Sequence, residues 1–142
     1  MTDFELAILN ACQEVLPFSA RSACFFHFCQ SLYRKIQSQG LQAAYNSPDR
    51  TVKDFTHKLA ALAFVPIADV ETYYEELKRT APATMNEYVA YFEATYLKGV
   101  PARGRRRAVP ARYPHHIWNQ YDAAKDGEAK TNNVSEGWHN RF

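Results

Sequence analysis

Apolar residues recur at spacings of three and four positions along most of this chain, which is the pattern of amphipathic helices. The first such pattern begins at Phe4 and ends before Pro17. Another begins at Phe28 and meets a stop signal at Gly40. Between them, residues 21–28 are rich in aromatic and small apolar side chains and are too short for a separate helix. We therefore predict a buried strand at residues 21–28.

Residues 51–97 predict an all-helical block of three amphipathic helices, separated at Pro66 and Pro82. No alternation typical of a strand interrupts this block. The residues predicted to face inward are Val52, Phe55, Leu59 and Leu62 in the first helix, Val70, Tyr73 and Leu77 in the second, and Tyr88, Phe92 and Tyr96 in the third. Pro114 then predicts the start of a further helix that ends near Gly127.

The chain has 142 residues, enough for one ordinary domain. Hydrophobic residues make up 46% of it, with only 5 Gly and 7 Pro, so we expect a buried core rather than disorder. Three cysteines cannot all pair, which favours a reducing compartment. The longest apolar stretch, residues 59–68, contains Pro66 and is shorter than the roughly 20 residues of a membrane span. We expect neither a signal peptide nor a membrane partner.

The basic residues of this chain are concentrated in one stretch. Residues 98–112 carry six positive charges and no acidic side chain, so the rest of the chain is net negative although the total is +2. The six residues are Lys98, Arg103, Arg105, Arg106, Arg107 and Arg112. Such a run is usually a solvated loop, and contact with nucleic-acid phosphates is the alternative. Nearby, Tyr113 and Trp118 are expected in the core, with stacking on a base as the alternative.

Cys24 and His27 have the spacing of two metal ligands, although two ligands do not complete a tetrahedral zinc site. The alternative is a structural pair in the core. If zinc binds, His139 or the pair His115 and His116 would supply the further ligands. We expect Cys24 and His27 at the junction of a short strand and the following helix.

Two carboxylates lie near predicted helix ends. Asp3 stands at the start of the first helix, where a negative charge favours the helix dipole. Glu136 follows Asn133 by three residues, which is the capping-box spacing at the start of a final helix. Taken singly, each residue has an ordinary structural role.

Five ordered blocks of the sequence resemble the second half of the transposase domain of Mutator-like elements (MULEs), including members found in animal genomes. The blocks are Thr2-Asp3-Phe4-Glu5, Cys24-Phe25-Phe26-His27-Phe28-Cys29-Gln30, Leu62-Ala63-Phe64-Val65-Pro66, Trp118-Asn119-Gln120-Tyr121 and Thr131-Asn132-Asn133-Val134-Ser135-Glu136-Gly137-Trp138-His139. They span almost the whole chain, and five ordered blocks are difficult to match by chance.

The resemblance implies an α/β fold: the C-terminal part of a ribonuclease-H-like core, mainly helical by residue count, with an all-α insertion. In that family a DDE triad, two aspartates and a glutamate, holds divalent metal ions. The resemblance places Asp3 at the second aspartate of the triad and Glu136 at its glutamate. It places Cys24 and His27 at the CxxH motif of the family, and whether this motif binds Zn²⁺ stays open. Asp3 and Glu136 would share Mg²⁺ or Mn²⁺ in the complete parent, where paired ions activate the nucleophile and stabilise the leaving oxygen.

The resemblance also implies the regions into which the chain divides and the partner that it binds. Residues 1–45 would supply a core strand and helices, residues 46–97 the helical insertion, residues 98–113 a basic loop, and residues 114–142 the C-terminal helices with the glutamate. The partner would be DNA, namely the transposon ends in the parent. The residues expected to contact DNA are Arg103, Arg105, Arg106, Arg107 and Arg112. A nuclear protein, cytoplasmic before import, and a homo-oligomeric parent are expected.

The sequence departs from the family at the first aspartate, which should lie on a strand upstream of Asp3. Because no residue before Asp3 can take that role, we expect this fragment to be inactive alone, whereas the complete parent cleaves DNA and transfers strands. At most one or two strands of the core would remain. The alternative is a non-enzymatic remnant that binds DNA or a protein through residues 103–112 and the helical block.

Overall fold

A computed structural model describes residues 11, 14–15 and 23–127, and most of these residues are helical, as predicted. The helices are α2 (Phe25–Ser38), α3 (Gln42–Tyr45), α4 (Thr51–Ala61), α5 (Val70–Arg79), α6 (Asn86–Phe92), α7 (His115–Trp118) and α8 (Tyr121–Lys125). Between them lie the 3₁₀ turns η1 (Leu62–Phe64) and η2 (Ala83–Met85) and the π-helical turn η3 (Glu93–Leu97). None of these helices is long and apolar enough to cross a membrane.

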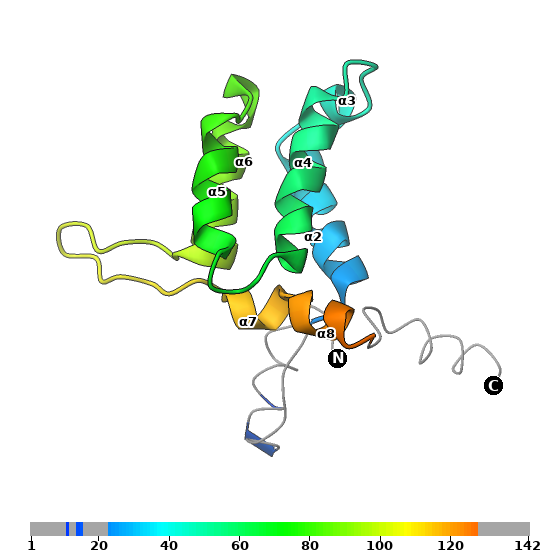
Figure 1. Cartoon of the computed structure of the whole chain (residues 1–142). Coiled ribbons are helices and arrows are strands. Elements are labelled where there is room, and N and C mark those ends of the chain that lie inside the picture. The colour runs from blue at the N-terminus through cyan, green and yellow to red at the C-terminus, as the bar shows by residue number, and fades with distance from the viewer. Residues whose placement is uncertain (1–10, 12–13, 16–22, 128–142) are drawn as a thin grey trace, which may run out of the picture.

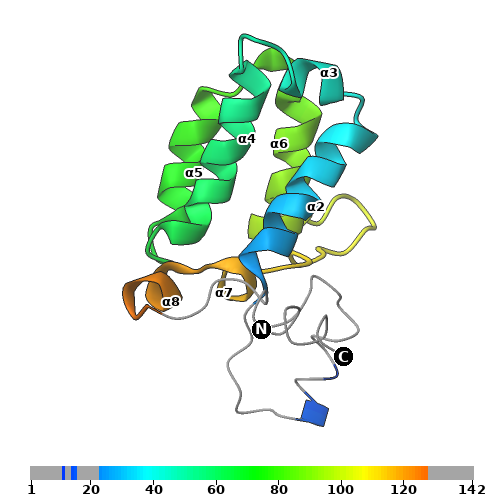
Figure 2. The same ribbon diagram turned by 90° about the vertical axis from the view of Figure 1, so that its right-hand side faces the viewer.

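Four helices, α2, α4, α5 and α6, stand side by side, with α3 at one end and α7 and α8 across the other (Figures 1 and 2). Residues 98–113, yellow in Figure 1, leave this helical body as a long loop. One hydrophobic core runs through the whole body, from Ala23 through the helices to Trp118. This core is continuous across the boundary between residues 45 and 46 that the family resemblance implies.

Helix α2 is central to that core because its apolar residues follow the helical period. Phe28, Leu32 and Ile36 are all buried, as the sequence predicted. The Tyr88 hydroxyl donates to the Leu32 carbonyl at 3.2 Å, which ties α6 to α2. Trp118 stacks on Phe28 with ring centroids 5.1 Å apart, which packs helix α7 against α2. Residues far apart in the sequence therefore meet on one face of α2.

The strand predicted at residues 21–28 is wrong from Phe25 onward, whereas Ala23 takes part in an isolated β-bridge. Helix α2 begins at Phe25, and Cys24 is its N-cap residue with an extended backbone. A strand buried on both faces would bury every side chain, yet Phe26 is 52% exposed while Phe28 is fully buried. The aromatic run is thus the amphipathic first turn of α2. The part of the expected ribonuclease-H-like core that falls on residues 25–28 is helix.

The three helices predicted within residues 51–97 are confirmed, but one residue predicted to face the core is exposed. Tyr73 was expected to point inward, but it is 50% exposed and Tyr74 is fully buried instead. Both tyrosines continue a helical pattern from Val70, at positions three and four residues later. Tyr74 is favoured because its hydroxyl donates to Glu93 Oε2 at 3.1 Å, whereas a buried hydroxyl without a partner is costly.

The single helix predicted from Pro114 to Gly127 is interrupted. Helix α7 ends at Trp118, Asn119 has an extended backbone, and α8 begins at Tyr121. Asn119 causes the break: its Oδ1 accepts from the backbone of Tyr121 at 3.0 Å and its Nδ2 donates to the Val65 carbonyl at 2.9 Å. These bonds replace those of a continuous helix, which is how asparagine competes with helical structure.

Candidate nucleic-acid interface

Residues 98–112, called here the arginine hairpin, fold back on themselves as a narrow antiparallel ribbon. Backbone hydrogen bonds join Val100 to Val109 at 2.8 and 2.9 Å, and Arg103 to Arg106 at 3.1 Å in both directions. Gly104, with a φ of 58°, is the first of the two residues at the tip. Glycine suits this position because two-residue hairpins of the type II′ class need a positive φ there. The predicted basic loop is therefore an ordered ribbon.

All five arginines of the arginine hairpin are exposed: Arg103, Arg105, Arg106, Arg107 and Arg112. Three of them, Arg103, Arg106 and Arg107, line one hollow of the ribbon together with Val100 and Val109. This hollow has a volume of about 1020 Å³, and Pro101 also lines it. Since the hairpin contains no acidic residue, nothing within it neutralises these guanidinium groups.

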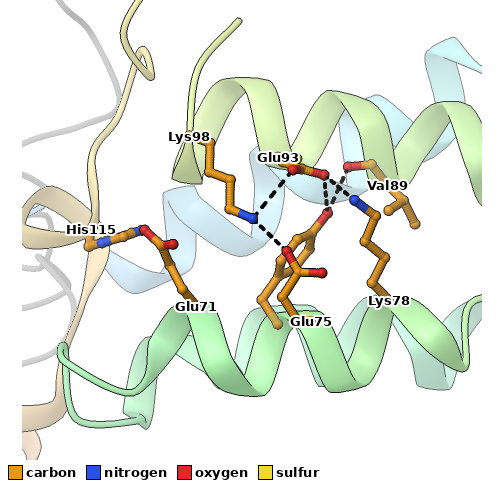
Figure 3. A network of polar contacts seen from close by, with 8 residues as sticks. Glu71, Glu75, Lys78, Val89, Glu93, Lys98 and His115 are labelled. Atoms are coloured by element: carbon orange, nitrogen blue, oxygen red, sulfur yellow. Dashed lines mark hydrogen bonds and ion pairs between the residues drawn. The ribbon is translucent and has the colours of Figure 1, made fainter. Parts of the chain in front are cut away.

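Lys98, the sixth basic residue, is already paired. Its Nζ lies 2.5 Å from Glu75 Oε1 and 3.6 Å from Glu93 Oε1 (Figure 3). The hydrogen bond to Glu75 raises the pKa of Lys98, and the same bond lowers the pKa of Glu75. The positive charge that the arginine hairpin presents to a partner is therefore that of its five arginines, one less than the sequence suggests.

Glu93 joins helix α5 to the start of the arginine hairpin (Figure 3). Besides Lys98, it accepts a hydrogen bond from Lys78 Nζ at 2.6 Å and one from the Tyr74 hydroxyl at 3.1 Å. Burial is the largest single influence and would raise the pKa of Glu93, but Lys78, Tyr74 and Lys98 together outweigh it and lower the pKa. The carboxylate thus stays charged and holds cations from α5 and from the hairpin.

The base of the arginine hairpin is also packed closely against itself. Gly99 has a φ of 72°, and a Cβ there would overlap the Val109 carbonyl oxygen and lie 2.6 Å from the Pro110 carbonyl carbon. Beyond the hairpin, the Tyr113 amide donates to the Thr95 carbonyl of η3 at 2.9 Å. The arginines therefore extend from a base that is fixed on both of its strands.

The two aromatic residues near the hairpin belong to the core. Trp118 is fully buried and Tyr113 is 7% exposed. The Trp118 indole donates to the carbonyl oxygens of Tyr96 and Tyr113 at 3.1 and 3.0 Å. A ring held in this way cannot stack on a nucleic-acid base without leaving the core. The core alternative is confirmed, and it argues against stacking of either ring on a base.

Cys24 and His27 lie at the start of α2, with Cys24 fully buried and His27 partly buried. Burial raises the pKa of the neighbouring Cys29 thiol to about 11, so Cys29 is protonated at neutral pH. Within residues 23–127, no three His, Cys, Asp or Glu side chains gather closely enough to hold a metal ion. His139 lies outside the described residues. Metal analysis, with folding followed under a chelator, distinguishes zinc binding from a structural role.

The two carboxylates assigned to the DDE triad, Asp3 and Glu136, lie outside the described residues, so their distance from each other remains a prediction. The final helix expected from Asn133 lies outside them too.

Two of the blocks that carry the family resemblance, residues 62–66 and 118–121, meet at one junction with Ala23, the residue before a third block, and no local pattern of the sequence predicted this. The Gln120 amide donates to the Ala63 carbonyl at 2.6 Å, and its side-chain Nε2 donates to the Ala23 carbonyl at 2.9 Å. The Ala23 amide donates in turn to the Ile117 carbonyl at 2.7 Å. Gln120 is fully buried, and a buried glutamine normally needs such hydrogen bonds. A glutamine among apolar neighbours is the signal in the sequence that could have indicated this junction.

His115 is a partly buried titratable group at this end of the helical body. Its Nε2 is buried and lies 3.9 Å from Glu71 Oε1, beyond hydrogen-bonding distance (Figure 3). Burial is the largest influence and lowers the pKa of His115, with the charge of Glu71 opposing it and His116 adding to it. His115 is therefore neutral at physiological pH.

Comparison of the chain with models of known protein families finds no match, and neither do comparisons with curated proteins and with solved structures.

Proposed function

We propose that this chain is part of a DDE-type DNA transposase of the Mutator-like kind, and that its helical body contacts DNA through the arginine hairpin. The observation that carries the DNA contact is the set of five exposed arginines on an anchored ribbon without an acidic residue. Arginine remains charged at every physiological pH and pairs with phosphate through two parallel hydrogen bonds. Contacts of this kind supply affinity without sequence preference.

The junction at Gln120 supports the transposase origin. The blocks 62–66 and 118–121 lie far apart in the sequence, yet hydrogen bonds join them there, and Phe25 of the block 24–30 packs against Phe64 with ring centroids 4.8 Å apart. Segments that pack against one another must change together to keep their contacts. Joint resemblance of these segments to one family is therefore easier to explain by common origin than by separate coincidences.

In the complete parent, the activity would be DNA cleavage and strand transfer. Asp3 and Glu136 would hold Mg²⁺ or Mn²⁺ there, hard cations that prefer carboxylate oxygens. The alternative is a non-enzymatic remnant that binds DNA through the arginine hairpin, whose anchoring by Glu75 and Glu93 requires neither Asp3 nor Glu136. Mg²⁺-dependent nicking that Glu136→Gln abolishes would support the enzyme over the remnant.

The DNA contact is tested by fluorescence anisotropy with a labelled duplex over a range of salt concentrations. Replacing Arg105, Arg106 and Arg107 by Ala should weaken binding and flatten its salt dependence by about 0.9 in log–log slope for each phosphate that is no longer neutralised. The matched control removes three exposed cations from helices α2, α4 and α5, namely Arg34, Lys58 and Arg79. Equally weakened binding in both triple variants, or unchanged binding in both, would refute the hairpin as the DNA-binding element.

A further inference from the structure

The shape of the arginine hairpin restricts which nucleic acid it can bind. It is a two-stranded ribbon, with strands about 4.8 Å apart in general, and every residue from 101 to 110 is exposed. A two-stranded ribbon enters the major groove of B-form DNA, which is about 12 Å wide, but is too broad for the minor groove of about 6 Å. Arginine side chains along both strands add to its breadth.

The ribbon is longer than that groove is deep. Gly104, at the tip, is four positions after Val100, and a strand advances about 3.3 Å per residue, so the tip stands roughly 13 Å beyond the Val100 and Val109 pair. The major groove is about 8.5 Å deep. Arg103, Arg105 and Arg106 can thus reach base edges while the base of the hairpin stays outside. Arginine is suited to both targets, since it binds guanine edges as well as phosphates.

The side chains of the hairpin argue against single strands. Proteins that bind single-stranded nucleic acid stack bases on aromatic rings, and residues 98–112 contain no aromatic residue. The neighbouring Tyr113 and Trp118 are held in the core. Double-stranded RNA is disfavoured for a different reason, because the major groove of its A-form helix is too narrow for side chains to read.

From these constraints we propose that the arginine hairpin enters the major groove of B-form double-stranded DNA, an inference that rests on the proposed function. Arg103, Arg105 and Arg106 at the tip face the groove. Arg112, at the base, lies beside Tyr113 with its guanidinium 5.5 Å from the ring centre and remains at the phosphates. The anchored base sets the direction in which the ribbon leaves the helical body.

The test compares three labelled ligands of equal length with the purified chain at one salt concentration: a DNA duplex, its single strand and the matching RNA duplex. We expect the DNA duplex to bind at least about 5-fold more tightly than either other ligand, because only its major groove admits the ribbon. Groove choice is tested next on the DNA duplex. Netropsin, which occupies the minor groove, should leave binding unchanged. Glucosylated hydroxymethylcytosine, which fills the major groove, should weaken binding by a similar factor.

The outcomes separate this inference from the function on which it rests. Equal binding of all three ligands that still depends on Arg105, Arg106 and Arg107 would overturn groove insertion but keep the DNA contact. Competition by netropsin would overturn it in the same way. Absence of binding to every ligand would overturn both proposals. The circular dichroism spectrum of each variant should match that of the unsubstituted chain. The variant that lacks Arg34, Lys58 and Arg79 again serves as the control for the change in net charge.

Discussion

The ammonium group of Lys98 lies 2.5 Å from the carboxylate of Glu75, a residue 23 positions earlier in the chain. This ion pair joins the first residue of the arginine hairpin to helix α5. It also removes one charge from the basic stretch, because Lys98 and Glu75 neutralise each other. Lys98 should therefore add little to the attraction between the hairpin and DNA.

Replacing Lys98 and Glu75 together by Gln should leave the salt dependence of DNA binding unchanged. The double substitution keeps the net charge, and the paired lysine has no charge to offer a phosphate. Arg112→Gln should by contrast reduce the log–log slope by about 0.9 if Arg112 contacts a phosphate. The measurement is the anisotropy titration repeated at several salt concentrations. A reduction of slope in the double variant equal to that of one arginine would show that Lys98 does contact DNA.

Gly99→Ala should destabilise the protein more than Gly104→Ala, although both glycines have positive φ. The backbone conformation costs alanine about 1–2 kcal/mol at either position. Only at Gly99 would the new methyl group also overlap the backbone of Val109 and Pro110, whereas nothing lies within 4 Å of a Cβ at Gly104. Urea denaturation followed by far-ultraviolet circular dichroism gives both free energies of unfolding. Equal values for the two variants would contradict the close packing at the hairpin base.

His115 should make the protein less stable as the pH falls below 6.5. Burial holds the pKa of folded His115 below its ordinary value of 6.5, so the unfolded chain binds a proton more readily than the folded one. The free energy of unfolding therefore falls as the pH drops through 6.5 and on through the lowered pKa. Glu75 and Glu93, whose pKa values are also lowered, contribute mainly as the pH falls through 4.5 and below, so most of the window from pH 7.5 to 5 lies above their titration.

His115→Asn should flatten this pH dependence. The matched control is His116→Asn, because His116 is exposed and contributes less to the pKa of His115 than burial does. Denaturation midpoints measured every half pH unit provide the comparison. If His116→Asn flattened the profile as much as His115→Asn, burial of His115 would not be the cause.

Trp118→Phe should lower the free energy of unfolding by about 1–3 kcal/mol, because the carbonyl oxygens of Tyr96 and Tyr113 lose a buried donor. Trp118→Ala should cost about 3–5 kcal/mol, because it also leaves a cavity beside Phe28. Urea denaturation measures both effects.

The same residue provides a test of base stacking. In a Trp138→Phe background, Trp118 is the only tryptophan of the chain and its fluorescence can be followed alone. Because the indole is buried, saturating DNA should leave its emission unchanged, as should iodide. Strong quenching by bound DNA would show that the ring reaches a base.

The sequence by itself determined those features that a short segment encodes. The apolar period of α2 selected Phe28, Leu32 and Ile36 correctly, because a helix repeats the same face every three to four residues regardless of its partner. The exposure of the five arginines was equally predictable, since an unpaired charge is too costly to bury.

Only the tertiary structure decided features that depend on distant partners. Tyr73 and Tyr74 fit the period of α5 equally well, and Glu93 on a neighbouring element selected Tyr74. The sequence of the first turn of α2 is also compatible with a strand. The contact that favours the helix is the stacking of Trp118 on Phe28, which buries one side of this turn. The helix after Pro114 breaks because Asn119 finds the Val65 carbonyl, 54 residues away. In each case local propensities were nearly balanced, so one long-range hydrogen bond or ring contact determined the outcome.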